Sequence, residues 1–105
     1  MIIAGLKNIF WIIINYFMFN IKNVKFDVLA LKKIKGIPFI KNEGEIIFGN
    51  INLNSTYNYN PIGGQTFSTF VTTSTGKIVI NDSVGISNST IFSMSKVEIE
   101  KGVLI

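Results

Sequence analysis

The side chains that could do chemistry in this chain are amides, hydroxyls, lysines and a few carboxylates. The 105 residues include no His and no Cys. The chain therefore has no imidazole base, no thiolate nucleophile and no Cys or His ligand for zinc. Asp82 has no second carboxylate at a spacing that would pair with it, so we interpret it as a turn residue. We predict no catalytic residue and no metal ligand.

The charged residues point away from nucleic acid as a partner. Ten Lys stand against six acids, giving a formal charge of +4, and the sequence contains no Arg. Arg is the residue that pairs bidentately with guanine and phosphate, so we expect no nucleic-acid recognition. The cluster of Lys32, Lys33 and Lys35 is interpreted as a solvated face.

A long polar stretch from Asn52 to Thr75 is predicted to be a loop. It contains Asn60-Pro61 and Gly63-Gly64, which favour turns. One interpretation is an ordinary excursion from the fold. The other is a contact with a sugar or a neighbouring subunit, which its aromatic and amide side chains would suit.

The elements that must position these residues fall into two regions, and residues 1–33 form an apolar N-terminal segment. Its densest run, Ile9 to Phe19, is too short to cross a bilayer. We predict a β-rich or helical segment that packs on the rest of the fold. The alternative is attachment to a membrane surface, with aromatic and basic side chains at the lipid headgroups. Those side chains are Trp11, Tyr16, Lys7 and Lys22.

The second region, residues 34–105, shows an internal repeat. Lys77 to Ile86 aligns without gaps with Lys96 to Ile105, nineteen residues later. Within the repeat Ile80, Ile86 and Phe92 follow one another at steps of six residues. Gly44 to Asn50 is a weaker, earlier copy of Gly76 to Asp82.

A six-residue step predicts a mostly β fold in which the chain coils as a solenoid. One short strand and a tight turn make one side of a triangular coil, and the aliphatic residue at the head of each hexad points inside. We therefore expect residues 76–105 to form stacked parallel strands. Ile80, Ile86 and Ile99 should point inside, and Lys77, Lys96 and Lys101 outside.

The segments Ile80 to Ile91 and Val97 to Ile105 resemble the hexapeptide-repeat acyltransferases of the left-handed parallel β-helix fold. The resemblance covers about residues 34–105 and is closest to the O-acetyltransferases of sugars and polysaccharides. Asn60 to Gln65 adds to the likeness with the polysaccharide enzymes. Asn81 and Glu100 depart from the pattern, because such repeats usually place Gly there.

The resemblance implies transfer of acetyl from acetyl-CoA to a sugar hydroxyl by a bacterial homotrimer with active sites between subunits. In the family the base is a His beyond the segment matching Val103 to Ile105. We therefore expect an incomplete solenoid, an N-terminal fragment that is inactive alone and binds no acetyl-CoA, since the coenzyme lies along later coils.

The resemblance also singles out Asn88 for binding the acceptor sugar. Related enzymes carry an Asn at this place, and an amide can donate to one hydroxyl while it accepts from another. The alternative is that Asn88 holds a corner of the coil, where Asn tolerates left-handed backbone.

A second class of function stays open beside the acyltransferase. A non-catalytic β-solenoid, acting as a structural or interaction module, would need no His. Whether the chain is an enzyme is therefore not decided by its sequence. We expect a cytoplasmic location, with membrane association through Ile9 to Phe19 as the alternative.

Overall fold

A computed structural model describes residues 2–55 and 68–105, with the side chains of residues 9–55 and 68–105. The chain begins with one α-helix, α1, and continues through short strands and a 3₁₀ helix, η1. In chain order the elements are α1 (Ile2–Ile21), β1 (Val24–Phe26), η1 (Val28–Lys33), β2 (Ile34–Gly36), β3 (Phe39–Asn42), β4 (Glu45–Phe48), β5 (Asn52–Ser55), β6 (Thr69–Thr72), β7 (Lys77–Ile80), β8 (Gly85–Ser87), β9 (Thr90–Ser93) and β10 (Lys96–Ile99).

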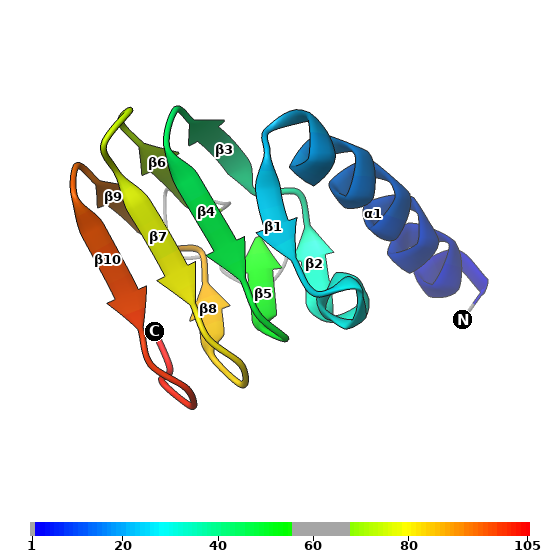
Figure 1. Cartoon of the computed structure of the whole chain (residues 1–105). Coiled ribbons are helices and arrows are strands. Elements are labelled where there is room, and N and C mark those ends of the chain that lie inside the picture. The colour runs from blue at the N-terminus through cyan, green and yellow to red at the C-terminus, as the bar shows by residue number, and fades with distance from the viewer. Residues whose placement is uncertain (1, 56–67) are drawn as a thin grey trace.

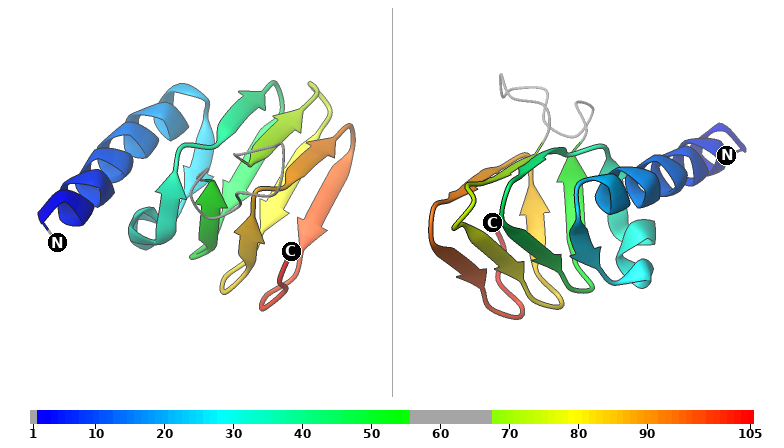
Figure 2. Two further views of the ribbon diagram at one scale, coloured as in Figure 1. Left: turned by 180° about the vertical axis from the view of Figure 1, so that it is seen from behind. Right: turned by 45° about the horizontal axis from the view of Figure 1, so that its top comes forward.

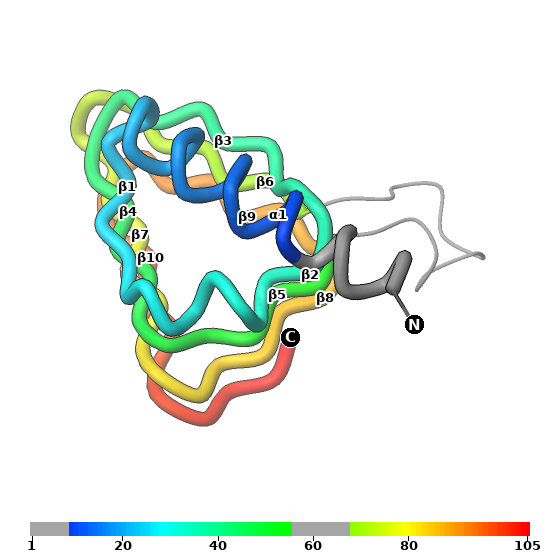
Figure 3. Tube along the Cα trace, turned by 90° about the vertical axis from the view of Figure 1, so that its right-hand side faces the viewer, coloured from blue at the N-terminus to red at the C-terminus, as the bar shows by residue number. Residues whose placement is uncertain are grey.

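The strands form three parallel sheets, and every third strand returns to the same sheet. The sheet orders are β1-β4-β7-β10, β2-β5-β8 and β3-β6-β9. Figure 1 shows the strands stacked in successive layers, and the view along the stack in Figure 3 shows the three sheets as sides of a triangle. The prediction of a mostly β chain with parallel sheets is confirmed.

The register of the sheets matches the internal repeat. Lys77 to Ile80 pairs residue for residue with Lys96 to Ile99. Glu45 to Phe48 pairs in the same way with Lys77 to Ile80. The segments that are similar in sequence therefore lie directly above one another, as the repeat predicted.

The core lies inside the triangle and consists mainly of aliphatic side chains. Ile80, Ile86 and Ile99 are buried, as predicted. Lys96 and Lys101 are exposed and Lys77 is half-buried with its ammonium in an ion pair, so the lysines point outward. The largest side chains that are fully covered are Phe19, Phe48, Phe70, Ile46, Ile51, Leu53, Ile78, Ile80 and Val84.

Phe92, which continues the six-residue step after Ile80 and Ile86, does not point inside. Its side chain is 54% exposed, whereas Ser93 is buried. The step from Ile86 to the inward residue of β9 is seven residues instead of six, because the extra residue of the nineteen lies between β8 and β9. Asn88, in that turn, has a positive φ of 44°.

One side of the interior carries a polar ladder. Asn42, Thr72 and Ser93 are register partners at the ends of β3, β6 and β9. The Thr72 hydroxyl donates to Oδ1 of Asn42 over 2.6 Å. The Ser93 hydroxyl donates to the backbone carbonyl of Lys77 over 2.9 Å. These bonds satisfy buried polar groups at the corner where the chain turns toward the next sheet.

The coil begins earlier than the sequence suggested, and parts of the predicted loop are strands. Strand β1 already belongs to a sheet of the coil, ahead of the boundary predicted at residue 34. Strands β5 and β6 both lie within the predicted loop of residues 52–75. Asn60 to Gln65, the stretch that added to the family resemblance, lies outside the described residues.

Helix α1 covers the first end of the coil (Figure 2). Its inner side includes Asn15 and Phe19, both fully buried. The Phe19 ring packs edge-on against Phe48, which packs in the same way on Phe70. Of the two predicted forms of the N-terminal segment, the helical one is observed. Among the described residues, no helix has the length and hydropathy needed to cross a membrane.

Candidate functional site

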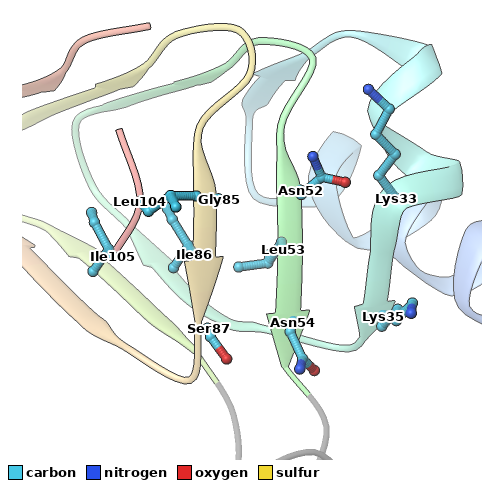
Figure 4. A pocket seen from close by; sticks show the side chains of 10 residues that line it. All are labelled: Lys33, Lys35, Asn52, Leu53, Asn54, Gly85, Ile86, Ser87, Leu104 and Ile105. Carbon is cyan, nitrogen blue, oxygen red and sulfur yellow. The ribbon is translucent and has the colours of Figure 1, made fainter. Parts of the chain in front are cut away.

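A pocket of about 450 Å³ lies along the sheet β2-β5-β8. It extends from the end of η1 to the C-terminal residues, and Figure 4 shows its lining side chains. The lining combines lysines, amides and a hydroxyl with aliphatic groups. The residues are Lys33, Lys35, Asn52, Leu53, Asn54, Gly85, Ile86, Ser87, Leu104 and Ile105.

The polar part of the lining is a ladder across three coils. Lys35 pairs in register with Asn54, and Asn54 pairs with Ser87. Side chains along a strand alternate between the two faces of a sheet. The neighbours Leu53 and Ile86 are buried inside the coil, so the ladder residues point to the outer face. The ladder thus presents an ammonium, an amide and a hydroxyl side by side.

The C-terminal residues form the far wall of the pocket. The N–H of Gly85 donates to the carbonyl of Val103 over 3.0 Å, and the N–H of Ile105 donates to the carbonyl of Gly85 over 2.8 Å. Leu104 therefore lies beside β8 in a parallel bridge with Gly85. Its side chain is 83% exposed, which gives the pocket an apolar rim.

Asn88 lies directly after β8, next to the ladder but outside the residues that line the pocket. Its N–H donates to the backbone carbonyl of Asn54 over 2.9 Å. Its φ of 44° is in the left-handed region, which Asn tolerates better than most residues. The corner role is therefore observed, and the role in sugar binding stays a prediction.

The carboxylates lie elsewhere. Oδ1 of Asp82 accepts a hydrogen bond from the backbone N–H of Asn50 over 2.7 Å, linking the corners of two successive coils. This is the structural turn role that its sequence context indicated. None of the residues that line the pocket is acidic.

Two glutamates on another sheet are held in their charged form. Lys25 and Lys77 each approach the Glu45 carboxylate to 3.3 Å. Their hydrogen bonds, that of Lys25 most strongly, hold the pKa of Glu45 below its ordinary value. The amide of Asn81, followed by Lys96, similarly lowers the pKa of Glu98. Both carboxylates belong to β1-β4-β7-β10 and are acceptors in ion pairs.

Donors to hydroxyl or anionic groups therefore dominate this pocket. Lysine ammonium groups donate only, and amides and hydroxyls both donate and accept. Such a set can hold a sugar, with the aliphatic rim against the apolar face of its ring. Across residues 9–55 and 68–105, no three His, Cys, Asp or Glu side chains gather to bind a metal.

Four of these polar residues were missed by sequence reasoning. Lys33 and Lys35 were assigned to a solvated face, and Asn52 and Asn54 to a loop. The signal that could have found them is the nineteen-residue interval, which separates Lys33 from Asn52 and Lys35 from Asn54. Residues one coil apart become neighbours in a parallel sheet.

Comparisons of the chain with protein-family models, with curated proteins and with solved structures find no match.

Proposed function

We propose that this chain forms the first coils of a sugar O-acetyltransferase of the hexapeptide-repeat type, with the left-handed parallel β-helix of that family. The observation that carries the proposal is the in-register stacking of a nineteen-residue repeat across parallel sheets. In this proposal the complete enzyme is a homotrimer that uses acetyl-CoA, and this chain contributes the surface that holds the acceptor.

The proposed acceptor surface is the ladder on the outer face of sheet β2-β5-β8, formed by Lys35, Asn54 and Ser87. The Asn54 amide and the Ser87 hydroxyl lie in register, and Asn88 follows within the same corner. A sugar offers several adjacent hydroxyls, each able to donate and accept. Amide and hydroxyl side chains meet both needs, and Lys35 adds a cation for an acidic sugar or a phosphate.

The transfer itself needs a base that this chain does not contain. The acceptor oxygen attacks the thioester carbonyl carbon and forms an ester, the carbon–sulfur bond breaks, and the hydroxyl proton passes through a base to the departing CoA thiolate. Because the sequence contains no His, the proposal places the base in further chain. We expect no acceptor-dependent release of CoA by the 105 residues alone.

The coding sequence after codon 105 is the first test. Further hexads followed by a His-bearing loop would support the acetyltransferase. An unrelated gene, or a polar repeat that covers the last coil, would contradict it.

A binding experiment tests the acceptor surface directly. Asn88→Gly retains the left-handed backbone and removes the amide, so we expect about fivefold weaker binding of an oligosaccharide in calorimetric titration, with thermal unfolding verifying that the variant is folded. Asn23→Gly is the matched control, because Asn23 also has a positive φ, of 58°, and lies between α1 and β1. Equal affinity of both variants and the parent would exclude Asn88 from the site.

A non-catalytic binding module is the second candidate. It is favoured by the composition of the pocket, whose donors and aliphatic groups suffice for holding a ligand but not for proton transfer. This candidate predicts sugar binding with no His-bearing extension downstream. The acetyltransferase predicts sugar binding together with a His-bearing extension downstream.

A further inference from the structure

We propose that the outer face of α1, together with the exposed lysines beside it, binds the surface of an anionic lipid bilayer. This inference concerns the end of the coil opposite to β10 and is independent of the acetyltransferase proposal.

The outer face of α1 is apolar and uncovered. Phe10, Ile13 and Phe17 follow one another at helical spacing and are 60%, 50% and 60% exposed. Ile9, Tyr16 and Ile21 are exposed as well. The buried side of the same helix, with Asn15 and Phe19, already rests on the coil. The helix therefore needs no further partner for the fold, yet presents a second apolar face to solvent.

Exposed apolar side chains also lie on η1, which contacts α1. Val28 and Leu29 are both exposed there. Figure 3, viewed from the α1 end, shows α1 and η1 at the same end of the coil. Exposed apolar residues gathered at one end of a molecule mark an interaction site more often than scattered single residues do.

Exposed lysines follow both elements that carry this apolar surface. Lys22 follows α1 and is exposed, as are Lys32 and Lys33 at the end of η1. Residues 1–42 contain seven Lys and one acid, Asp27, for a formal charge of +6, whereas residues 43–105 contain three Lys and five acids, for −2. The charge of the chain is thus concentrated at the end that carries the exposed aromatic groups.

Charge decides between a bilayer and a second copy of the chain. Two copies meeting through this end would bring two strongly positive surfaces together, which opposes association. An anionic membrane supplies the opposite charge and accepts aromatic rings at the level of its headgroups. Because one side of α1 already packs on the coil through Asn15 and Phe19, we expect the helix to lie in the plane of the surface with its exposed side toward the lipid.

The experiment uses sedimentation of the full chain with phosphatidylcholine vesicles that either lack or contain about 30% phosphatidylserine. We expect binding at least tenfold tighter to the anionic vesicles, weakened by added salt. Trp11 is the only Trp in the chain and lies on α1, so its emission should shift to the blue on the anionic vesicles alone.

Two variants separate the apolar and charged contributions. Phe10→Ser/Ile13→Ser/Phe17→Ser should lower vesicle affinity about a hundredfold. Lys32→Gln/Lys33→Gln should lower it roughly thirtyfold, from about a factor of five for each lysine at an anionic surface. The matched control is Phe92→Ser/Met94→Ser, which removes two exposed apolar side chains that lie outside α1 and η1. It should bind vesicles like the parent, and circular dichroism verifies that each variant is folded.

The proposal is overturned by either of two results. One is equal affinity for neutral and anionic vesicles, or for the parent and both variants. The other is a dimer in analytical ultracentrifugation that the α1 substitutions abolish while vesicle binding is absent, which would assign this face to a second copy.

Discussion

Asn15 is the only buried polar residue of the described part of α1, and its amide is half satisfied. Nδ2 donates to the backbone carbonyl of Gly36 over 3.0 Å, and Oδ1 has no hydrogen-bond partner. The amide thus joins the helix to strand β2 at the cost of one orphaned oxygen. An unpaired buried acceptor costs about 1–3 kcal/mol, so this contact specifies the position of the helix more than it stabilises the fold.

Asn15→Asp should destabilise the protein strongly. The change replaces a donor with a second oxygen facing the Gly36 carbonyl and places a carboxylate in a dry site. We expect the free energy of unfolding to fall by about 3–5 kcal/mol at pH 7, measured by urea titration. Asn20→Asp is the control, since the exposed Asn20 side chain donates to the carbonyl of Tyr16 within its own helix. Similar losses in the two variants would show that burial of Asn15 is not decisive.

The Glu45 ion pairs predict a small dependence of stability on acid. Because Lys25 and Lys77 lower the pKa of Glu45 in the folded state, its contribution is present at neutral pH and is lost as the pH falls below the ordinary Glu value of about 4.3. Glu45→Gln should therefore flatten the acid limb of the stability curve slightly. Both partners are partly solvated, so the effect should also shrink in high salt. An unchanged acid limb would show that the ion pairs contribute nothing.

At the scale of elements, the corners between strands limit how closely the coils stack. Gly76 precedes β7, and a Cβ at this position would overlap the carbonyl oxygen of Ser93 in the backbone above it. Gly44 makes the same close approach to Gly76 one coil earlier. The small residues at this corner are therefore required by contact between successive turns of backbone.

Gly76→Ala should lower the free energy of unfolding by roughly 3 kcal/mol, because backbone on one side must move away from backbone on the other. Gly102→Ala is the matched comparison. Gly102 has a φ of +84° but nothing within 4 Å of its Cβ position, so the change should cost only about 1 kcal/mol. Thermal unfolding of the two variants measures the difference, and a larger loss at Gly102 would contradict the stacking explanation.

These elements also show what the sequence could predict. The match of Lys77 to Ile80 with Lys96 to Ile99 gave the register of two strands, because residues that repeat at the coil length stack on their copies. The six-residue step failed at Phe92, which is exposed, because hydrophobicity alone does not show which turn contains the inserted residue. The pocket was missed because Lys35 and Asn54 are alike in neither charge nor shape, although they are one coil apart.

The N-terminal segment shows a second limit of prediction. Apart from Asn15, residues 9–19 are apolar or aromatic on all sides of α1, so periodicity could not separate the buried Phe19 from the exposed Phe17. Only the position of the coil end decides which side is covered. Strand β1 was assigned to the apolar segment because its three residues carry too little pattern to be recognised as a strand.

For the whole molecule, the strand β9 is the edge most open to association. It has no partner beyond β6 among the described strands, and Phe92 and the following Met94 are exposed. Edge strand β10 by contrast carries Lys96 and Glu98 in an ion pair. Charged side chains on an edge discourage pairing with another chain, and uncharged aromatic ones do not.

Phe92→Lys should therefore reduce concentration-dependent association of the purified chain without changing its fold. Light scattering at increasing concentration measures the effect, and we expect the onset to move to severalfold higher concentration. Ile37→Lys, which introduces the same charge at a partly exposed residue between β2 and β3, is the control. Equal improvement by both variants would assign the effect to net charge and not to the β9 edge.

The cover that α1 forms over the first coil gives the molecule a direction of assembly. Each later strand pairs with one that was made earlier in the chain, so a ribosome delivers every coil onto a surface that already exists. Phe19, Phe48 and Phe70 form the first links of this series, from the helix inward. The order of synthesis and the order of stacking are thus the same. Each new coil can fold onto the previous one while α1 covers the coil end next to β1.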